Sequence, residues 1–170
     1  MIKLRKIDLA QDSSYIFDLV KNHADMSIFL GDSRFNNFDE FCHWLEDRMS
    51  GYFHDFFIIE DNSDSGTRKR QGFVLSYDYR VYDSHCKVYG YFESKIGKIA
   101  LKQFMNILFR EYPLNKVFLV ITDIDVALLD AAQILGFKQE AVLCKNKFVN
   151  GEYHDLVILS LYSQYIGERI

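Results

Sequence analysis

The stretch Val117–Leu161 decides the fold, and it reads VFLVITDIDVALLDAAQILGFKQEAVLCKNKFVNGEYHDLVILSL. Its first five residues, Val117–Ile121, are all apolar, which is typical of a strand buried on both faces. Asp125 is a good N-cap for a short helix over Val126–Leu135, and Gly136 is placed to close that helix. The stretch therefore begins as a buried strand followed by a helix.

Its second half predicts a β-hairpin. Two runs of strand-forming residues, roughly Phe137–Phe148 and Tyr153–Leu161, flank the dipeptide Asn150-Gly151. Asn-Gly between such runs is the strongest short signal for a two-residue hairpin turn. We therefore expect the chain to end in two antiparallel strands.

Hydrophobic periodicity extends this organisation toward the N-terminus. An all-polar or glycine stretch, Asp61–Arg70, predicts a hairpin loop, and Asn37 predicts the start of a helix. The remaining expected elements are strands at Ile2–Ile7, Phe56–Ile59, Gln71–Tyr79 and Lys87–Phe92, and helices at Gln11–Lys21, Phe38–Ser50 and Gly97–Glu111. The order β-α-α-β-β-β-α-β-α-β-β predicts one α/β domain over residues 1–170, with a mixed sheet and helices on both faces.

Composition narrows the class of protein. With 170 residues, 49% hydrophobic and 26% charged, the chain is typical of a soluble single-domain protein. A net charge of −4 argues against a nucleic-acid partner, and no apolar run approaches the roughly 20 residues that span a bilayer. The N-terminus carries no secretory signal, and three widely spaced cysteines suit free thiols. We therefore expect a cytoplasmic protein with neither a nucleic-acid nor a membrane partner.

Two Cys-His neighbours raise the question of zinc. Cys42-His43 and His85-Cys86 are adjacent pairs. Adjacent side chains point to opposite sides of a strand and lie about 100° apart on a helix, so neither pair can chelate as a unit. We expect no metal site.

Several motifs in the last third of the chain occur together in one known family. A strand and short helix end in Leu135-Gly136-Phe137, Glu140 follows, and Phe148–Asp155 reads FVNGEYHD before the last strand. In this order the segment resembles the C-terminal half of GNAT acetyltransferases, in the branch that contains ribosomal-protein and spermidine N-acetyltransferases. The N-terminal half matches the family in its element order, and Lys21–Met26 is similar to the segment after the family's first helix.

The resemblance implies a mixed, mostly antiparallel sheet of about seven strands, with a V-shaped splay between the fourth and fifth. Acetyl-CoA would lie in the splay as the acyl donor, held by backbone groups of the fourth strand and by the start of the next helix. A helix start suits pyrophosphate because its N–H groups lack partners. The cofactor-binding residues implied are Tyr89, Tyr91, Phe92, Ser94, Lys95, Ile96, Gly97, Lys98 and Asp125.

The loop departs from the family pattern at several positions. Phe92 stands where the family has Arg or Gln, and Lys95 stands where it has its first Gly, whereas Gly97 is retained. Asp125 replaces an Asn that contacts pantetheine in many members. Ala132 replaces a Tyr that protonates the departing thiolate. We therefore expect Lys95 and Lys98 to supply much of the phosphate contact, and any catalysis to be slow or to use another acid.

Candidate site residues lie at the ends of the expected strands. Glu60 and Glu93 end two strands and are candidate general bases, since such a group must reach the nucleophile directly or through one water. Tyr91 is the third catalytic candidate, since the backbone N–H of the fourth strand near it would stabilise the oxyanion. Substrate-binding candidates are His85, His154 and Asp155. On surface statistics, each of the two carboxylates also fits a solvated strand end.

These features lead to one functional prediction and two alternatives. The prediction is an acyl-CoA-dependent N-acyltransferase that transfers its acyl group directly to a primary amine of a small molecule, an amino sugar or a protein N-terminus. The first alternative is a GNAT-like binding or regulatory module without catalysis. The second is an assembly subunit such as a homodimer, recognised by a large apolar interface and no open cleft.

Overall fold

A computed structural model describes residues 1–23, 26–31, 33–62 and 68–165. It contains one sheet of seven strands in the order β1-β2-β3-β4-β5-β7-β6. Only the β4–β5 pair is parallel, and every other pair is antiparallel. The expected mixed, mostly antiparallel sheet is therefore confirmed. Its strands are β1 (Ile2–Lys6), β2 (Phe53–Asp61), β3 (Lys69–Arg80), β4 (His85–Phe92), β5 (Lys116–Thr122), β6 (Lys138–Val149) and β7 (Glu152–Tyr162).

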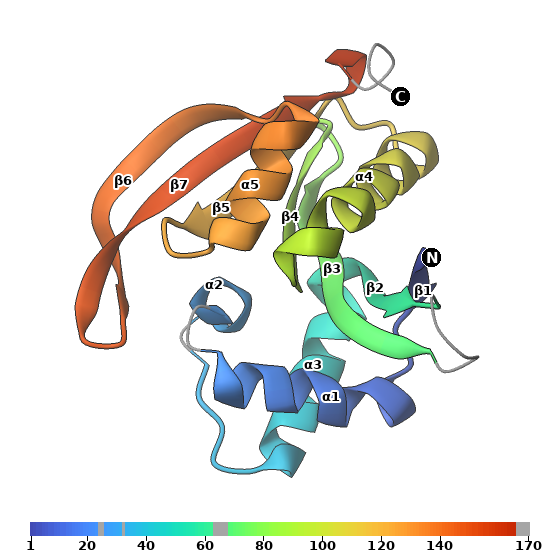
Figure 1. The fold of residues 1–170 in the computed structure, drawn as a ribbon, viewed down its shortest axis with the longest axis vertical. Coiled ribbons are helices and arrows are strands. Elements are labelled where there is room, and N and C mark those ends of the chain that lie inside the picture. Colours follow the sequence, from blue (N-terminus) through green and yellow to red (C-terminus); the bar gives the residue numbers. More distant parts are fainter. Residues whose placement is uncertain (24–25, 32, 63–67, 166–170) are drawn as a thin grey trace.

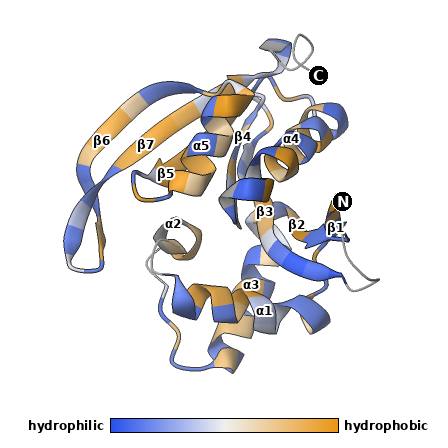
Figure 2. Ribbon diagram, viewed as in Figure 1, coloured by the Kyte–Doolittle hydropathy of each residue, from blue (hydrophilic) through white to orange (hydrophobic). Residues whose placement is uncertain are grey.

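Helices cover both faces of this sheet, as Figure 1 shows. On one face, Phe29 packs against Phe73 of β3 with ring centroids 5.1 Å apart. On the other, Phe104 lies 5.9 Å from Phe57 of β2, centroid to centroid. The first face carries α1 (Leu9–Asn22), α2 (Ser27–Leu30) and α3 (Phe38–Gly51), and the second carries α4 (Ser94–Glu111) and α5 (Val126–Leu135). Figure 2 shows that the apolar residues concentrate along the central strands and on one side of each helix.

Local signals in the sequence explain where these elements begin and end. Asn37 and Asp125 accept hydrogen bonds from Glu40 N and Leu128 N, so both predicted N-caps are confirmed. Gly136 closes α5 at φ 88°, in the left-handed region that glycine adopts without strain.

The last hairpin also forms as predicted. Asn150 and Gly151 have φ values of 52° and 90°, which fits the turn that Asn-Gly favours. The strands β6 and β7 flank this turn and form the far end of the sheet in Figure 1.

Two expectations need correction. Helix α4 begins at Ser94, three residues before the predicted Gly97, because Ile96 N and Gly97 N both bond to Glu93 O. The helix α3 runs one residue beyond the predicted Ser50, to Gly51, and Tyr52 is its C-cap. The helix α2 was not predicted, since four residues are too few to show a helical period. The middle of the predicted 61–70 loop, residues 63–67, lies outside the described residues.

Candidate functional site

The strands β4 and β5 separate toward their C-terminal ends. Their pairing runs from His85↔Lys116 to Val88↔Leu119 and stops there. β4 continues to Phe92 and β5 to Thr122, so the last residues of each strand have no partner on the other. β4 remains paired with β3 as far as Phe92, and β5 remains paired with β7 as far as Thr122. The result is a V-shaped splay in the middle of a sheet that is otherwise paired.

The first turn of α4 begins where β4 ends. Its N-cap is Glu93, whose side chain makes no capping hydrogen bond. A helix start without such a cap retains backbone donors and the positive end of the helix dipole for an anion. Lys95 and Lys98 are both exposed in this turn. This end of the splay can therefore accept a phosphate group through backbone donors and two nearby cations.

Gly97 has a different role from a phosphate-cradling glycine. A Cβ on Gly97 would lie 2.1 Å from Cε2 of Phe92, whose ring is buried. The missing side chain therefore makes room for the Phe92 ring against the start of α4. The ring takes the place of the polar residue that the family resemblance implies, so any anion contact there falls to the backbone and the lysines.

The β5 side of the splay carries polar groups. The Thr122 side chain is fully buried, and its hydroxyl has no hydrogen-bond partner among the described residues. Asp125 is buried at the start of α5, where it caps the helix. His154 Nδ1 lies 3.2 Å from Asp123 Oδ1, and Asp123 N donates to the backbone oxygen of Asp155. The predicted residues Asp125, His154 and Asp155 therefore gather at the same edge as the end of β4.

On the other side, Tyr91 lies in the splayed part of β4 and interacts with α1. Its hydroxyl is 2.8 Å from Nδ1 of His23, the C-cap residue of α1, and the two rings are 4.7 Å apart. Burial, together with the nearby Tyr91 and Glu93, raises the pKa of Tyr15 to about 12, so its hydroxyl stays protonated at neutral pH. Tyr89 is buried and its ring faces Phe29 of α2, 6.3 Å away.

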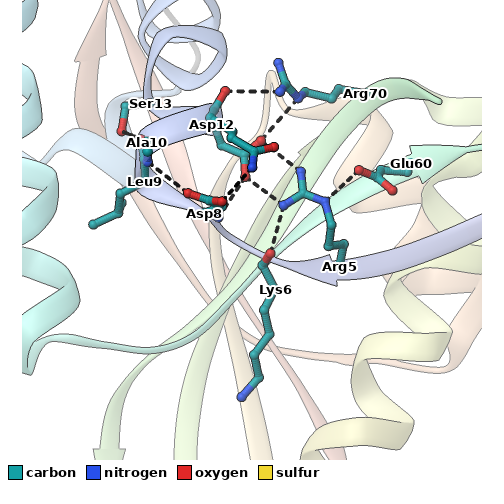
Figure 3. Close-up of polar contacts among 10 residues, drawn as sticks. Arg5, Lys6, Asp8, Leu9, Ala10, Asp12, Ser13, Glu60 and Arg70 are labelled. Atoms are coloured by element: carbon teal, nitrogen blue, oxygen red, sulfur yellow. Dashed lines mark hydrogen bonds and ion pairs between the residues drawn. The ribbon is translucent and has the colours of Figure 1, made fainter. Parts of the chain in front are cut away.

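The structure keeps Glu60 away from the splay. Glu60 lies on β2, with β3 between it and β4, and its Oε1 accepts a hydrogen bond of 2.7 Å from Arg5 Nε. Figure 3 shows this contact within a network in which the buried Asp12 pairs with both Arg5 and Arg70. The contact with Arg5 and the intervening strand keep this carboxylate out of reach of the splay. The network lies beside a surface hollow of about 910 Å³ that is lined by Arg5, Lys6, Asp8, Gln11, Tyr15, Glu60, Arg68, Lys69 and Arg70.

His85 is also placed elsewhere. It is the first residue of β4, opposite Lys116, and its ring contacts Phe118 edge-on. It therefore lies at the closed end of the V, a whole strand length from Phe92, and the expectation that it lines the substrate end is wrong. No group of three or more potential metal ligands occurs among the described residues. No described helix is long and apolar enough to cross a bilayer.

Comparison with known proteins shows which fold this chain shares with solved structures. No family model and no curated protein matches the sequence. Among solved structures, spermidine N-acetyltransferase from Vibrio cholerae in complex with CoA and spermine superimposes with a TM-score of 0.81 at 17% identity, over 97% of each chain. A chimera of that enzyme gives 0.82 at 17% identity over 99% of each chain. A dodecameric form gives 0.80 at 16% identity, over 99% of this chain and 98% of the other. The GNAT fold expected from the resemblance is therefore confirmed.

Three residues of the site were not among the candidates predicted from the sequence. His23 follows the last turn of a helix and gives no sign that it will meet a strand 68 residues later. Thr122 was hidden because it directly follows an apolar run. Asp123 stands between a strand and a helix in a position that could equally be solvated. Polar residues directly after a buried strand at a splay are the signal that could have identified the last two.

Proposed function

We propose that this protein is an acetyl-CoA-dependent N-acetyltransferase that acts on a primary amine. One observation carries the proposal: β4 and β5 separate after Val88, and the uncapped start of α4 lies at the open end. Unpaired strand backbone can hydrogen-bond the amides of a pantetheine arm, and a helix start favours pyrophosphate. The structural neighbours support this, since one of them is named for CoA and spermine bound together.

Each wall of the splay has a distinct part in this function. Acetyl-CoA supplies an acetyl group already activated as a thioester. In β4 beyond Val88, successive backbone N–H groups point alternately toward β3 and toward the splay, and those that face the splay are donors for the thioester oxygen, where charge develops during attack. Lys95 and Lys98 add positive charge for the phosphates, and Asp125 orders the start of α5 on the opposite wall. Ala132 is fully buried within α5 and cannot donate a proton, so the leaving sulfur takes its proton from another group or from water.

The acceptor is a cationic amine on this proposal. Asp123 and Asp155 stand at the end of β5 and the start of β7, and Glu93 is exposed at the end of β4. Carboxylates around the open end attract an ammonium group and raise its local concentration. Polyamines, amino sugars and protein N-termini all fit this chemistry, and spermidine is the first probe because the structural neighbours act on it by name.

A second function is favoured by Phe92 and Ala132. The Phe92 ring fills the space at Gly97, and the family's acid position is a buried alanine. Both changes fit a module that binds an acyl-CoA or another ligand in the splay without transferring the acyl group.

The test is thiol release from acetyl-CoA in the presence of spermidine, glucosamine or a short peptide with a free N-terminus. Amine-dependent release of CoA supports the transferase. Binding of acetyl-CoA without release for any acceptor supports the binding module. Absence of acetyl-CoA binding would overturn the transferase and any module that binds an acyl-CoA.

A further inference from the structure

A histidine and a tyrosine from distant parts of the chain meet beside the splay. His23 Nδ1 and the Tyr91 hydroxyl are 2.8 Å apart, and both side chains are half-buried. The backbone of His23 is held on both sides, because its N–H bonds to Leu19 O and its carbonyl accepts from Met26 N. The imidazole is therefore positioned by the end of α1, and it does not hang on a free loop.

Tyr91 places this contact next to the splay. Tyr91 belongs to the part of β4 that has lost β5 as a neighbour. It is paired with Phe73 of β3, and Phe73 packs against Phe29, so Tyr91 faces the side covered by α1 and α2. Helix α4, with its proposed phosphate site, lies on the other face of the sheet. A donor bound at α4 and an acceptor entering from the α1 side would meet at the splay beside Tyr91.

Amine acetylation needs a proton acceptor at that point. An ammonium ion has no lone pair, so it must lose one proton before the nitrogen can attack the thioester carbon. Of the two carboxylates expected for this task, Glu60 is fixed by Arg5 two strands away, and Glu93 is exposed at the start of α4. In the described part of the chain, Tyr91 and His23 are the hydrogen-bonded titratable pair that borders the splay on the α1 side.

We propose that Tyr91 and His23 together accept the proton that the acceptor amine loses, an inference that rests on the proposed function. The ammonium gives one proton to the Tyr91 oxygen while the Tyr91 proton moves to His23 Nδ1. The neutral amine then forms the C–N bond, the C–S bond breaks, and the second amine proton ends on the CoA sulfur. The imidazolium of His23 then releases one proton to solvent, since the ring is half-exposed, and exchange with solvent returns the ring to the tautomer that carries its proton on Nε2 and has Nδ1 free to accept again. The sum is one amide, one CoA thiol and one released proton.

The surrounding groups agree with this direction of proton transfer. The titratable and charged groups that interact with the neighbouring Tyr15 are Tyr91 itself, Glu93 and Arg70. Glu93 brings a negative charge close to this cluster, and the positive charge of Arg70 is paired with the buried Asp12.

The experiment compares His23→Gln, His23→Ala and Tyr91→Phe with wild type in the acetyl-CoA and spermidine assay. We expect kcat/KM at pH 7 to fall about 10²-fold in each variant, at the lower end of general-base effects. The defect should shrink between pH 7 and pH 10, because a free primary amine with a pKa near ~10.4 needs less help there. Imidazole added to His23→Ala should restore part of the rate. The double variant should be no slower than either single variant, because the two groups act as one unit.

Controls separate this role from a structural one. His43→Gln changes an exposed histidine whose Nδ1 contacts Asp39 O of its own helix, and its rate should equal that of wild type. All variants should keep the wild-type melting temperature and CoA affinity. A defect of constant size at every pH, or less than threefold at pH 7, would overturn the pair while leaving the transferase intact. Failure of wild type to bind acetyl-CoA, or to transfer its acetyl group once bound, would overturn the proposed function and this inference with it.

Discussion

Two regions of the sheet differ in whether their polar groups have partners. At β1–β3, Asp12 is completely buried and holds two arginines, and Glu60 adds a third contact to Arg5. At β4–β5, the start of α4 has no side-chain cap, Thr122 has a buried hydroxyl without a partner in the described structure, and the two strands do not pair beyond Val88.

This difference indicates that the first region stabilises the fold and that the second is available for a ligand. A carboxylate that is buried and paired holds the fold together, and removing it leaves charges without partners. Polar groups that the fold leaves unsatisfied are costly unless something binds them. The hollow near Arg5 has a volume of about 910 Å³, yet its central charges are already paired. The splay is the better candidate for a ligand because β4 and β5 do not pair with each other beyond Val88 and Leu119.

The largest effect is expected from Asp12→Ala. It leaves Arg5 and Arg70 without their shared buried partner and should lower the free energy of unfolding by about 3 kcal/mol. Urea denaturation measures this. Glu111→Gln, which removes an exposed pair with Arg110, should cost under ~1 kcal/mol. Equal losses in the two variants would contradict the contrast between the regions.

Acid should affect the same network. Burial opposes ionisation of Asp12, but its hydrogen bonds from Arg5 outweigh this and the pKa is lowered below its ordinary value. A lowered folded-state pKa gives stability that is present above the unfolded value of about 3.9 and is lost as pH falls below it. Wild type should therefore lose more stability than Asp12→Ala between pH 5 and pH 2. Parallel curves for the two proteins would show that Asp12 is not the group responsible.

The splay can be perturbed by a single methyl group. Gly97→Ala places a Cβ against the buried Phe92 ring, and overpacking of this kind typically costs about 1–3 kcal/mol. The better helix propensity of alanine returns just under ~1 kcal/mol, so we expect a net loss of about 1 kcal/mol and weaker CoA binding. Gly51→Ala is the matched control, because a Cβ there meets nothing within 4 Å and should be neutral or stabilising. A stabilised Gly97→Ala protein would mean that Phe92 moves freely.

The smallest effect is expected at the two lysines of α4. Replacing Lys95 and Lys98 with Ala should raise the Kd for CoA about fivefold at low salt and less at high salt, because exposed charges are screened. Lys6→Ala with Lys69→Ala removes the same charge from the hollow, and it should leave the Kd unchanged. Isothermal titration calorimetry measures both. An equal change in the Kd for CoA in both double variants would show that only the net charge of the protein matters.

Much of this contrast could be predicted from the sequence, but not all of it. The caps at Asn37, Asp125 and Gly136 and the turn at Asn150 are local signals, so every described α-helix and strand except the short α2 could be predicted in its order. The splay was expected through the family resemblance and not through any periodicity. Contacts between distant segments, such as His23 with Tyr91, depend on the tertiary packing of a helix end against a strand.

Some errors have a physical cause that is visible only in the structure. Glu60 was predicted as a base because strand ends often carry function, but Arg5 on the neighbouring strand neutralises it. His85 was expected near the substrate, but it is the first residue of β4 that pairs with β5 and so lies at the closed end. In both cases the residue type suits the predicted role, but the position of the residue in the sheet does not.

Thermal unfolding with and without CoA or acetyl-CoA tests the central claim, that the β4–β5 splay and the start of α4 form an acyl-CoA site. Ligand at 100 times its Kd should add about 2.7 kcal/mol to the stability of the native state, with a clear rise in Tm. We expect that rise for wild type, a smaller rise for Lys95→Ala with Lys98→Ala at the same concentration, and an unchanged rise for Lys6→Ala with Lys69→Ala. A melting curve that does not move at millimolar CoA, or one that loses its shift only when the hollow is mutated, would contradict it.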